Sequence, residues 1–189
     1  MRIIAGVAKG RTLSSVAGAT RPTSDRAREG LFSSLLSEFG DFLGLNFLDL
    51  FAGSGAIGLE ALSRGASLVH AVEKDESACK TIRNNEELIG PTPGTFHLFS
   101  MSAHRFLETA APATYHIVYI DPPYDYSSKE LNEVLVQLLA GGFIRPDAVI
   151  AVERAAKADT LVWPEGYAVL RERKYGQAVI YYGILAQNG

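Results

Sequence analysis

Short apolar runs alternate with amphipathic stretches along most of the chain, and this alternation predicts an α/β fold. Five apolar runs have the length of buried strands in a parallel sheet, and they cover residues 46–50, 67–73, 95–99, 116–121 and 148–153. The stretches between them place apolar residues at helical spacing, which predicts helices over 55–64, 76–88, 103–109 and 129–140. Strands that alternate with helices predict a doubly wound sheet with helices on both faces.

The N-terminal part of the chain departs from this alternation. Residues 2–16 mix apolar residues with small or basic ones around two glycines, which predicts a hairpin or an irregular extended arm. Thr23 or Ser24 is placed to cap a helix over about 24–39. That helix is expected to bury a stripe that begins with Leu31 and Phe32 and ends at Phe39.

The C-terminal part also differs from the strand–helix alternation. Two strand-like runs, 168–174 and 178–185, are separated by only three residues, which predicts an antiparallel hairpin at the end of the parallel sheet. The expected architecture is therefore a mostly parallel seven-stranded sheet with a small N-terminal extension. We divide it into a basic arm or hairpin over 1–22 and a single main domain over 23–189.

Composition narrows the class of protein. The chain has 189 residues, and its 47% apolar content is that of a globular protein that buries a core. No segment reaches the roughly 18 apolar residues that a membrane span needs, and the first residues lack a signal-peptide pattern. The single cysteine, Cys79, excludes an internal disulfide and is expected to be a small buried side chain. A cytoplasmic protein without a membrane partner is expected.

Charge is distributed unevenly along the chain, whose net charge is −3. Residues 1–30 hold six basic and two acidic residues, a net +4, which leaves −7 on the remainder. Such asymmetry is typical of a polyanion-binding face on an acidic body. The alternative is a solvated terminal arm, and charge alone does not decide between the two.

A glycine-rich turn follows the first predicted strand of the sheet. Gly53, Gly55 and Gly58 have the G-x-G-x-x-G spacing between a strand and a helix, where glycine lets the backbone approach a ligand closely. Glu73 stands twenty residues after the first glycine, at the end of the next strand, where an acid accepts hydrogen bonds from ribose hydroxyls. Together these features predict a cofactor that contains adenosine.

Asp49 helps to decide between two cofactors that contain adenosine, NAD and S-adenosylmethionine. In dinucleotide-binding folds the pyrophosphate lies at the helix N-terminus that follows the glycines. The Asp49 carboxylate, four residues before the first glycine, would repel a pyrophosphate but would bind the ammonium group of a methionine moiety. This favours S-adenosylmethionine over NAD.

The sequence Asp121-Pro122-Pro123-Tyr124 ends the fourth predicted strand, at the edge where open α/β sheets bind ligands. An aryl-type amine is a weak nucleophile because its lone pair is delocalised. The Asp121 carboxylate and the Pro122 carbonyl would accept its two N–H groups and aim the lone pair, and neither proline brings a competing N–H. Tyr124 offers a ring on which a flipped base stacks.

Four segments in this order resemble the bacterial small-subunit ribosomal RNA guanine-N2 methyltransferase D family, a group of amino-methyltransferases with the Asp-Pro-Pro-Tyr motif. They are RPTSDRAREGLF over 21–32, LDLFAGSGAIGLEALSRGA over 48–66, and Val72-Glu73 followed by Asp121 to Tyr124. The resemblance extends from Arg2 to about Tyr182, which is nearly the whole chain. It implies a Rossmann-like fold of the S-adenosylmethionine-dependent methyltransferase type.

The resemblance also implies roles for particular residues. The catalytic residues would be Asp121, Pro122, Pro123 and Tyr124. S-adenosylmethionine would be bound by Arg21, Thr23, Asp49, Phe51, Gly53, Ser54, Gly55, Glu73, Ser102 and Ala103. On charge rather than on the resemblance, Lys9, Arg11 and Arg26 of the basic N-terminal segment are expected to bind RNA. The expected partner is 16S ribosomal RNA or the small ribosomal subunit, the expected state is a monomer, and no metal is expected.

Other activities remain open at this point. Adenine-N6 and protein-glutamine methyltransferases use the same four-residue motif, although 189 residues leave no room for the target-recognition domain of a DNA-modifying enzyme. A non-catalytic RNA- or nucleotide-binding module is the alternative from another class. The intact glycine turn, Glu73 and the Asp-Pro-Pro-Tyr motif argue against it.

Overall fold

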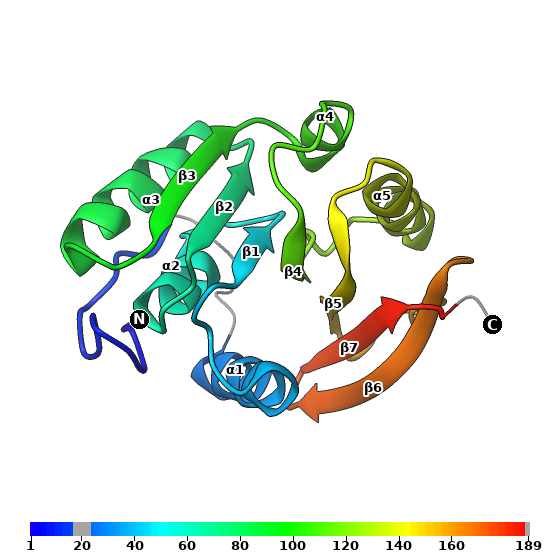
Figure 1. The fold of residues 1–189 in the computed structure, drawn as a ribbon, viewed down its shortest axis with the longest axis horizontal. Coiled ribbons are helices and arrows are strands. Elements are labelled where there is room, and N and C mark those ends of the chain that lie inside the picture. The colour runs from blue at the N-terminus through cyan, green and yellow to red at the C-terminus, as the bar shows by residue number, and fades with distance from the viewer. Residues whose placement is uncertain (17–23, 188–189) are drawn as a thin grey trace.

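A seven-stranded sheet with the strand order β3-β2-β1-β4-β5-β7-β6 forms the centre of the computed structural model, which describes residues 1–16 and 24–187 (Figure 1). The strands are β1 (Asn46–Asp49), β2 (Leu68–Glu73), β3 (Thr95–Ser100), β4 (Tyr115–Ile120), β5 (Ile144–Ala155), β6 (Tyr167–Tyr175) and β7 (Ala178–Leu185). β1 to β5 pair in parallel, whereas β7 is antiparallel to both β5 and β6. The predicted mostly parallel sheet with a C-terminal antiparallel hairpin is confirmed.

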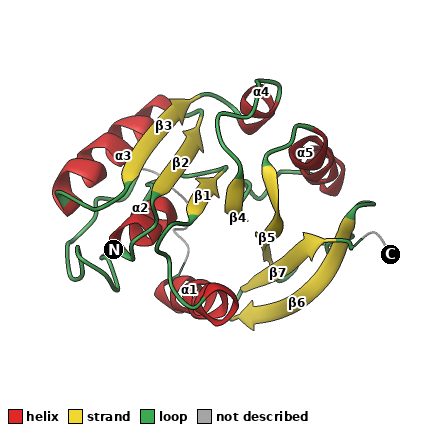
Figure 2. Ribbon diagram, viewed as in Figure 1, coloured by secondary structure: helices red, strands yellow, loops and turns green. Residues whose placement is uncertain are grey.

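Helices cover both faces of this sheet (Figures 1 and 2). They are α1 (Asp25–Phe39), α2 (Ala56–Ser63), α3 (Glu76–Ile89), α4 (Ala103–Leu107) and α5 (Ser128–Ala140). Each one overlaps a helix that the sequence predicts. Ser24 caps α1, because its side chain accepts a hydrogen bond from the Ala27 N–H, so the second of the two predicted caps is confirmed.

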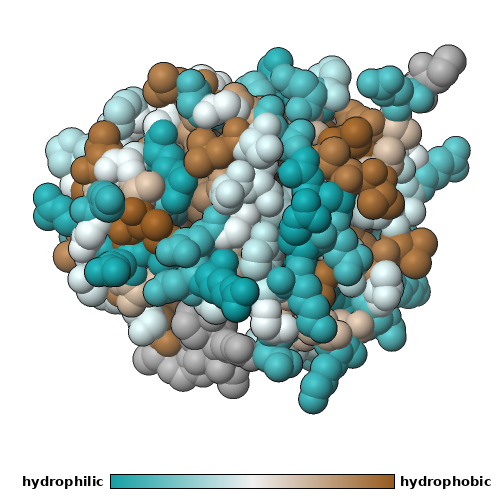
Figure 3. Space-filling view, turned by 90° about the horizontal axis from the view of Figure 1, so that it is seen from below, coloured by the Kyte–Doolittle hydropathy of each residue, from teal (hydrophilic) through white to brown (hydrophobic). Residues whose placement is uncertain are grey.

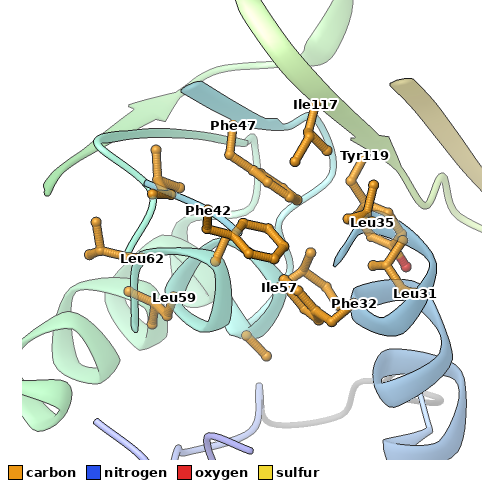
Figure 4. Packing of buried hydrophobic residues seen from close by; sticks show 14 of the residues in the cluster. Leu31, Phe32, Leu35, Phe42, Phe47, Ile57, Leu59, Leu62, Ile117 and Tyr119 are labelled. Carbon is orange, nitrogen blue, oxygen red and sulfur yellow. The ribbon is translucent and has the colours of Figure 1, made fainter. Parts of the chain in front are cut away.

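Neighbouring residues of the central strands pack into two separate cores, because side chains alternate across a sheet. In β1, Phe47 joins a core with α1, α2 and the end of α3, while Leu48 joins a core with α4 and α5. Figure 4 shows the first core, where side chains from α1, α2, β1 and β4 meet. Its labelled members are Leu31, Phe32, Leu35, Phe42, Phe47, Ile57, Leu59, Leu62, Ile117 and Tyr119.

β5 is longer than the apolar run over 148–153 predicts. At its start, Ile144 pairs with Tyr115 of β4, and the next pair is Val149 with Ile117, so the register shifts across the residues between Ile144 and Val149. Pro146 lies inside this irregular stretch and is exposed, where the N–H that proline lacks is not needed by the ladder. An exposed, bulged strand end carries no apolar signal, and the sequence pattern therefore misses it.

The N-terminal residues form the predicted hairpin, with Arg2 and Thr12 paired in an antiparallel bridge. This hairpin packs tightly on α2 rather than extending into solvent. The buried Glu60 carboxylate accepts hydrogen bonds from the Ile4 N–H at 2.7 Å and the Ala5 N–H at 3.0 Å. It also accepts one from Arg64 Nε at 2.7 Å. The Glu60 carboxylate of α2 therefore binds two backbone amides of the arm.

The surface of the described residues gives no sign of a membrane span. No helix among residues 1–16 and 24–187 is long and apolar enough to cross a bilayer. On the face shown in Figure 3, hydrophilic side chains form a broad band across the middle, and apolar side chains lie in separate patches.

Replacing Glu60 by alanine is expected to lower the free energy of unfolding by about 3–5 kcal/mol, because it leaves two partly buried amides and the Arg64 guanidinium without their acceptor. Denaturant unfolding monitored by circular dichroism measures this loss. Glu76→Ala is the matched control, since Glu76 pairs with Lys80 at the exposed surface of α3, and it should leave the unfolding midpoint unchanged. Equal midpoints for both variants would contradict the docking role of Glu60.

Candidate active site

Two adjoining cavities open at the carboxyl ends of the parallel strands, where an open α/β sheet binds its ligands. The larger has a volume of about 600 Å³ and the smaller about 240 Å³. Phe51, Gly53 and Asp121 line both cavities, so the glycine turn and the start of the Asp-Pro-Pro-Tyr motif form their common wall.

Most of the predicted site residues line these cavities. Those in the wall of the larger cavity are Phe51, Gly53, Glu73, Ser102, Ala103, Asp121, Pro122, Pro123 and Tyr124. Those in the wall of the smaller cavity are Asp49, Phe51, Gly53, Ser54 and Asp121. Gly55 lines neither cavity but is the N-cap residue of α2, and Arg21 and Thr23 lie outside the described residues.

The backbone turn between β1 and α2 has the conformation that its glycines allow. Gly53 and Gly55 have φ angles of +55° and +76°, in the left-handed region that side chains disfavour. A Cβ atom on Gly55 would also lie 3.2 Å from Ile82 of α3. The Asn85 side chain of α3 donates to the Ser54 carbonyl at 2.9 Å and so holds the turn from outside.

Asp49 is fully buried at the end of β1, and only one of its oxygens is bonded. Oδ2 accepts a hydrogen bond from the Gly58 N–H of α2 at 3.2 Å. Oδ1 is buried and has no partner among the described residues. The pKa of the Asp49 carboxyl is raised to about 7, mainly by burial; the Gly58 hydrogen bond opposes this rise, and the nearby Glu73 charge adds to it.

Glu73 lies beside the same turn and is held by two backbone amides. Its Oε2 accepts from the Gly53 N–H and its Oε1 accepts from the Asp75 N–H, each at 2.8 Å. A carboxylate oxygen has further lone pairs, so both oxygens remain able to accept a hydrogen bond from a ligand hydroxyl. Behind it, the buried Cys79 thiol contacts the Glu73 carbonyl at 3.3 Å, which confirms that Cys79 is a small buried side chain.

The opposite wall of the larger cavity begins with Ser102 and Ala103, at the start of α4. The Ser102 hydroxyl oxygen accepts from the Arg105 N–H at 3.2 Å and caps this short helix. Its hydroxyl proton remains available to a ligand, because an N-cap uses only the oxygen as acceptor.

The Asp-Pro-Pro-Tyr segment runs from the cavity wall to the surface. Pro122 is buried, and the Pro123 carbonyl accepts the Tyr126 N–H at 2.9 Å, which folds the segment into a turn. Tyr124 beyond it is 68% exposed, so its ring is free to meet a flat partner at the mouth of the cavity.

Sequence reasoning missed an aromatic wall beside this motif. The Tyr126 hydroxyl lies 2.9 Å from His104 Nε2, and the His104 Nδ1 lies 3.3 Å from the Gln137 side-chain oxygen. The Tyr126 ring also meets Phe51 edge to face at 5.3 Å. Both His104 and Tyr126 line the larger cavity. His104 in α4 and Tyr126 in the loop before α5 lie too far apart in the sequence for a local spacing pattern to predict their contact.

The far side of the larger cavity also lacks a sequence signal. It is formed by the end of β5 and by the turn between β6 and β7, which contribute Glu153, Arg154, Tyr175 and Gln177. The Glu153 carboxylate is held by the Tyr119 hydroxyl at 2.7 Å. Only the strand order, with β7 inserted between β5 and β6, brings this turn to the site.

The predicted RNA-binding residues Lys9, Arg11 and Arg26 are all exposed. Hydrogen bonds from Val7 and Ala8 hold the tip of the hairpin to Ser63, at the opposite end of α2 from the glycine turn. α2 has eight residues, so the tip lies roughly 12 Å along this helix from the turn. The role of these residues in RNA binding stays a prediction.

Over the ranges 1–16 and 24–187, no three His, Cys, Asp or Glu side chains gather in a way that would hold a metal ion.

The strand order, the glycine turn after β1 and the acid at the end of β2 define an S-adenosylmethionine-dependent methyltransferase type of fold. The chain belongs to the family described as Conserved hypothetical protein 95, which it matches over residues 1–184. It is 36% identical to the Escherichia coli strain K12 protein named "Ribosomal RNA small subunit methyltransferase D", over 94% of this chain and 86% of that one. The Haemophilus influenzae protein of the same name is 32% identical, over 93% and 89%.

Solved structures agree with this family membership. A structure titled "Putative methyltransferase yhhF from Escherichia coli" superposes with a TM-score of 0.82 and 31% identity, over 98% of this chain and 97% of that chain. The resemblance to the small-subunit methyltransferase D family, first found in the motifs, is thereby confirmed.

The raised pKa of Asp49 has a consequence for stability. The folded protein holds a proton on Asp49 that the unfolded chain releases, so this carboxyl lowers the free energy of unfolding as pH rises from about 4 to about 7. Asp49→Asn should therefore stabilise the ligand-free protein at pH 8, by up to about 4 kcal/mol, and have little effect at pH 4. Denaturant unfolding at a series of pH values measures the difference between variant and wild type.

Asp159→Asn is the matched control, because Asp159 is exposed, and its difference from wild type should stay flat across the series. A flat difference for Asp49→Asn as well would contradict the raised pKa of this buried carboxyl.

Proposed function

We propose that this protein transfers a methyl group from S-adenosylmethionine to the exocyclic N2 amine of a guanine in 16S ribosomal RNA. The observation that carries the proposal is the position of Asp121, in the wall between the glycine-turn cavity and the larger cavity. An amine held there would lie beside a cofactor bound along the glycine turn. The names of the Escherichia coli and Haemophilus influenzae relatives support ribosomal RNA of the small subunit as the substrate.

The residues of the two cavities fit the cofactor. The unpartnered Oδ1 of Asp49 in the smaller cavity suits an ammonium group, and a buried carboxylate of this kind opposes a pyrophosphate. The Glu73 carboxylate in the larger cavity suits two ribose hydroxyls. In this proposal, the Ser102 hydroxyl and the Ala103 backbone in the same cavity would contact the adenine ring.

Bound S-adenosylmethionine supplies a methyl group that its sulfonium already activates, so most of the catalysis comes from positioning. The Asp121 carboxylate and the Pro122 carbonyl accept the two N–H groups of the guanine amine and direct its lone pair toward the methyl carbon. The base stacks on Tyr124. The amine would take the methyl group as the bond between sulfur and the methyl carbon breaks and S-adenosylhomocysteine leaves, and the amine proton would then pass to Asp121 or to water.

Two further statements belong to this proposal. The protein acts on the RNA as a monomer in the cytoplasm, and the basic residues Lys9, Arg11 and Arg26 dock the phosphate backbone. Adenine-N6 or glutamine methylation would use the same amine geometry, and the chemical identity of the product separates these activities.

The proposal is tested on ribosomal RNA from a strain that lacks the gene. Mass spectrometry of the nucleosides should show the loss of one N2-methylguanosine from 16S ribosomal RNA and its return when the gene is restored. Loss of N6-methyladenosine instead would replace guanine by adenine as the acceptor. An unchanged set of methylated nucleosides would favour a non-catalytic RNA-binding protein.

Asp121→Ala is expected to abolish methyl transfer while leaving affinity for S-adenosylhomocysteine nearly intact, because Asp121 acts on the amine. Tyr124→Ala should weaken acceptor binding by about 1–3 kcal/mol, the value of one stacked base. Single-turnover methylation and calorimetry measure the two effects separately. Asp147→Ala, at the start of β5, is the control and should match wild type. Wild-type turnover by Asp121→Ala would disprove the role assigned to this carboxylate.

Lys9→Glu combined with Arg11→Glu should weaken RNA binding and reduce its salt dependence, by a slope of roughly 0.7–0.9 for each phosphate that the arm no longer neutralises. Filter binding of 16S ribosomal RNA across a salt series measures the slope. The control is Lys80→Glu combined with Lys129→Glu, which makes the same change in net charge on α3 and α5. Equal slopes for the two double variants would mean that the arm binds no phosphates of its own.

A further inference from the structure

Arg28 is a fully buried arginine in the first turn of α1, and much of its hydrogen-bonding capacity is unused. Its Nη2 donates to the Arg2 carbonyl at 2.7 Å and to the Asp25 carboxylate at 2.9 Å. These bonds join the N-terminal arm to α1. The Nε and Nη1 atoms are buried and have no partner among the described residues.

Unpaired donors on a buried guanidinium are unfavourable, because the group has lost water without gaining acceptors. Other buried charges of this protein are better satisfied. The Glu60 carboxylate, for example, accepts three hydrogen bonds from the arm and from Arg64. Packing between α1 and the arm uses one nitrogen of Arg28, and the other two require a different explanation.

The smaller cavity offers an explanation for the two unpaired nitrogens of Arg28, because Arg28 and Asp49 both line its wall. Asp49 is the opposite case, a buried carboxylate with one oxygen that lacks a donor. No hydrogen bond or ion pair joins the two side chains within the described part of the chain. One wall of the cavity therefore offers spare donors, and another offers a spare acceptor.

A ligand group that completes both residues must carry a negative and a positive charge close together. The amino-acid end of S-adenosylmethionine has this character, with an α-carboxylate and an α-ammonium on one carbon. Charge-assisted bonds between a guanidinium and a carboxylate are among the strong hydrogen bonds of proteins. Gly53 and Ser54 of the glycine turn line the same cavity, so this end of the cofactor would enter beside the turn.

We propose that Arg28 binds the α-carboxylate of the cofactor while Asp49 binds its α-ammonium. The proposal rests on the function given above, since it assigns a residue to the cofactor of that reaction. Arg28 then makes the protein select ligands that carry the amino-acid end. It also links cofactor binding to the arm, because the same guanidinium holds the Arg2 carbonyl.

The test compares two ligands in calorimetry with Arg28→Met. S-adenosylhomocysteine carries the amino-acid end, and 5′-methylthioadenosine lacks it but keeps the adenosine. The variant should bind S-adenosylhomocysteine about 10- to 100-fold more weakly, the effect of removing a charge-assisted hydrogen bond. Its affinity for 5′-methylthioadenosine should equal that of wild type. Arg28→Lys, which keeps the charge and fewer donors, should recover part of the lost affinity.

Arg145→Met is the matched control, because Arg145 pairs with Asp147 at the surface, and it should leave both affinities unchanged. Equal weakening of both ligands by Arg28→Met and by Arg28→Lys would make Arg28 a structural residue and overturn the proposal. Unchanged S-adenosylhomocysteine binding in Arg28→Met would overturn it too, with the proposed function intact. Failure of the wild-type protein to bind either ligand would instead remove the proposed function.

Discussion

The backbone turn between β1 and α2 is held by side chains from three different elements, and the site depends on this restraint. Asp49 of β1 accepts the Gly58 N–H, Glu73 of β2 accepts the Gly53 N–H, and Asn85 of α3 donates to the Ser54 carbonyl. Asn85 also exchanges two hydrogen bonds with the backbone of Ser14. The turn, the sheet and the N-terminal arm are therefore fixed by one connected set of hydrogen bonds.

This restraint is costly in the absence of a ligand. It buries a carboxylate whose pKa rises to about 7, and it leaves donors of Arg28 and an oxygen of Asp49 without partners among the described residues. Buried polar groups of this kind are rare in cores and common at functional sites. A cofactor with complementary charges would satisfy them, and binding would then stabilise the folded protein. The unpaired atoms of Arg28 and Asp49 that lower the stability of the ligand-free protein are thus the same atoms that would bind the cofactor.

Local patterns predict the elements of this fold well but do not predict how distant segments meet. The glycine turn, Glu73 and the Asp-Pro-Pro-Tyr segment each follow a strand, and parallel strands bring their carboxyl ends together. Arg28, in contrast, is one of several cations in the first 30 residues and lies in the predicted helix over 24–39, and nothing in the sequence indicates that its side chain is buried. Its burial, the His104–Tyr126 pair and the turn after β6 depend on packing between elements far apart in the chain, for which one sequence holds no periodic signal.

In the proposed mechanism, the Asp-Pro-Pro-Tyr segment presents a guanine amine to a methyl donor bound along the glycine turn. Incubation of the purified protein with methyl-labelled S-adenosylmethionine and small-subunit ribosomal RNA, followed by nucleoside digestion and mass spectrometry, tests it most directly. We expect label in N2-methylguanosine, and none when Asp121→Ala replaces the wild-type protein. Label in another nucleoside, or the same label with Asp121→Ala, would contradict this mechanism.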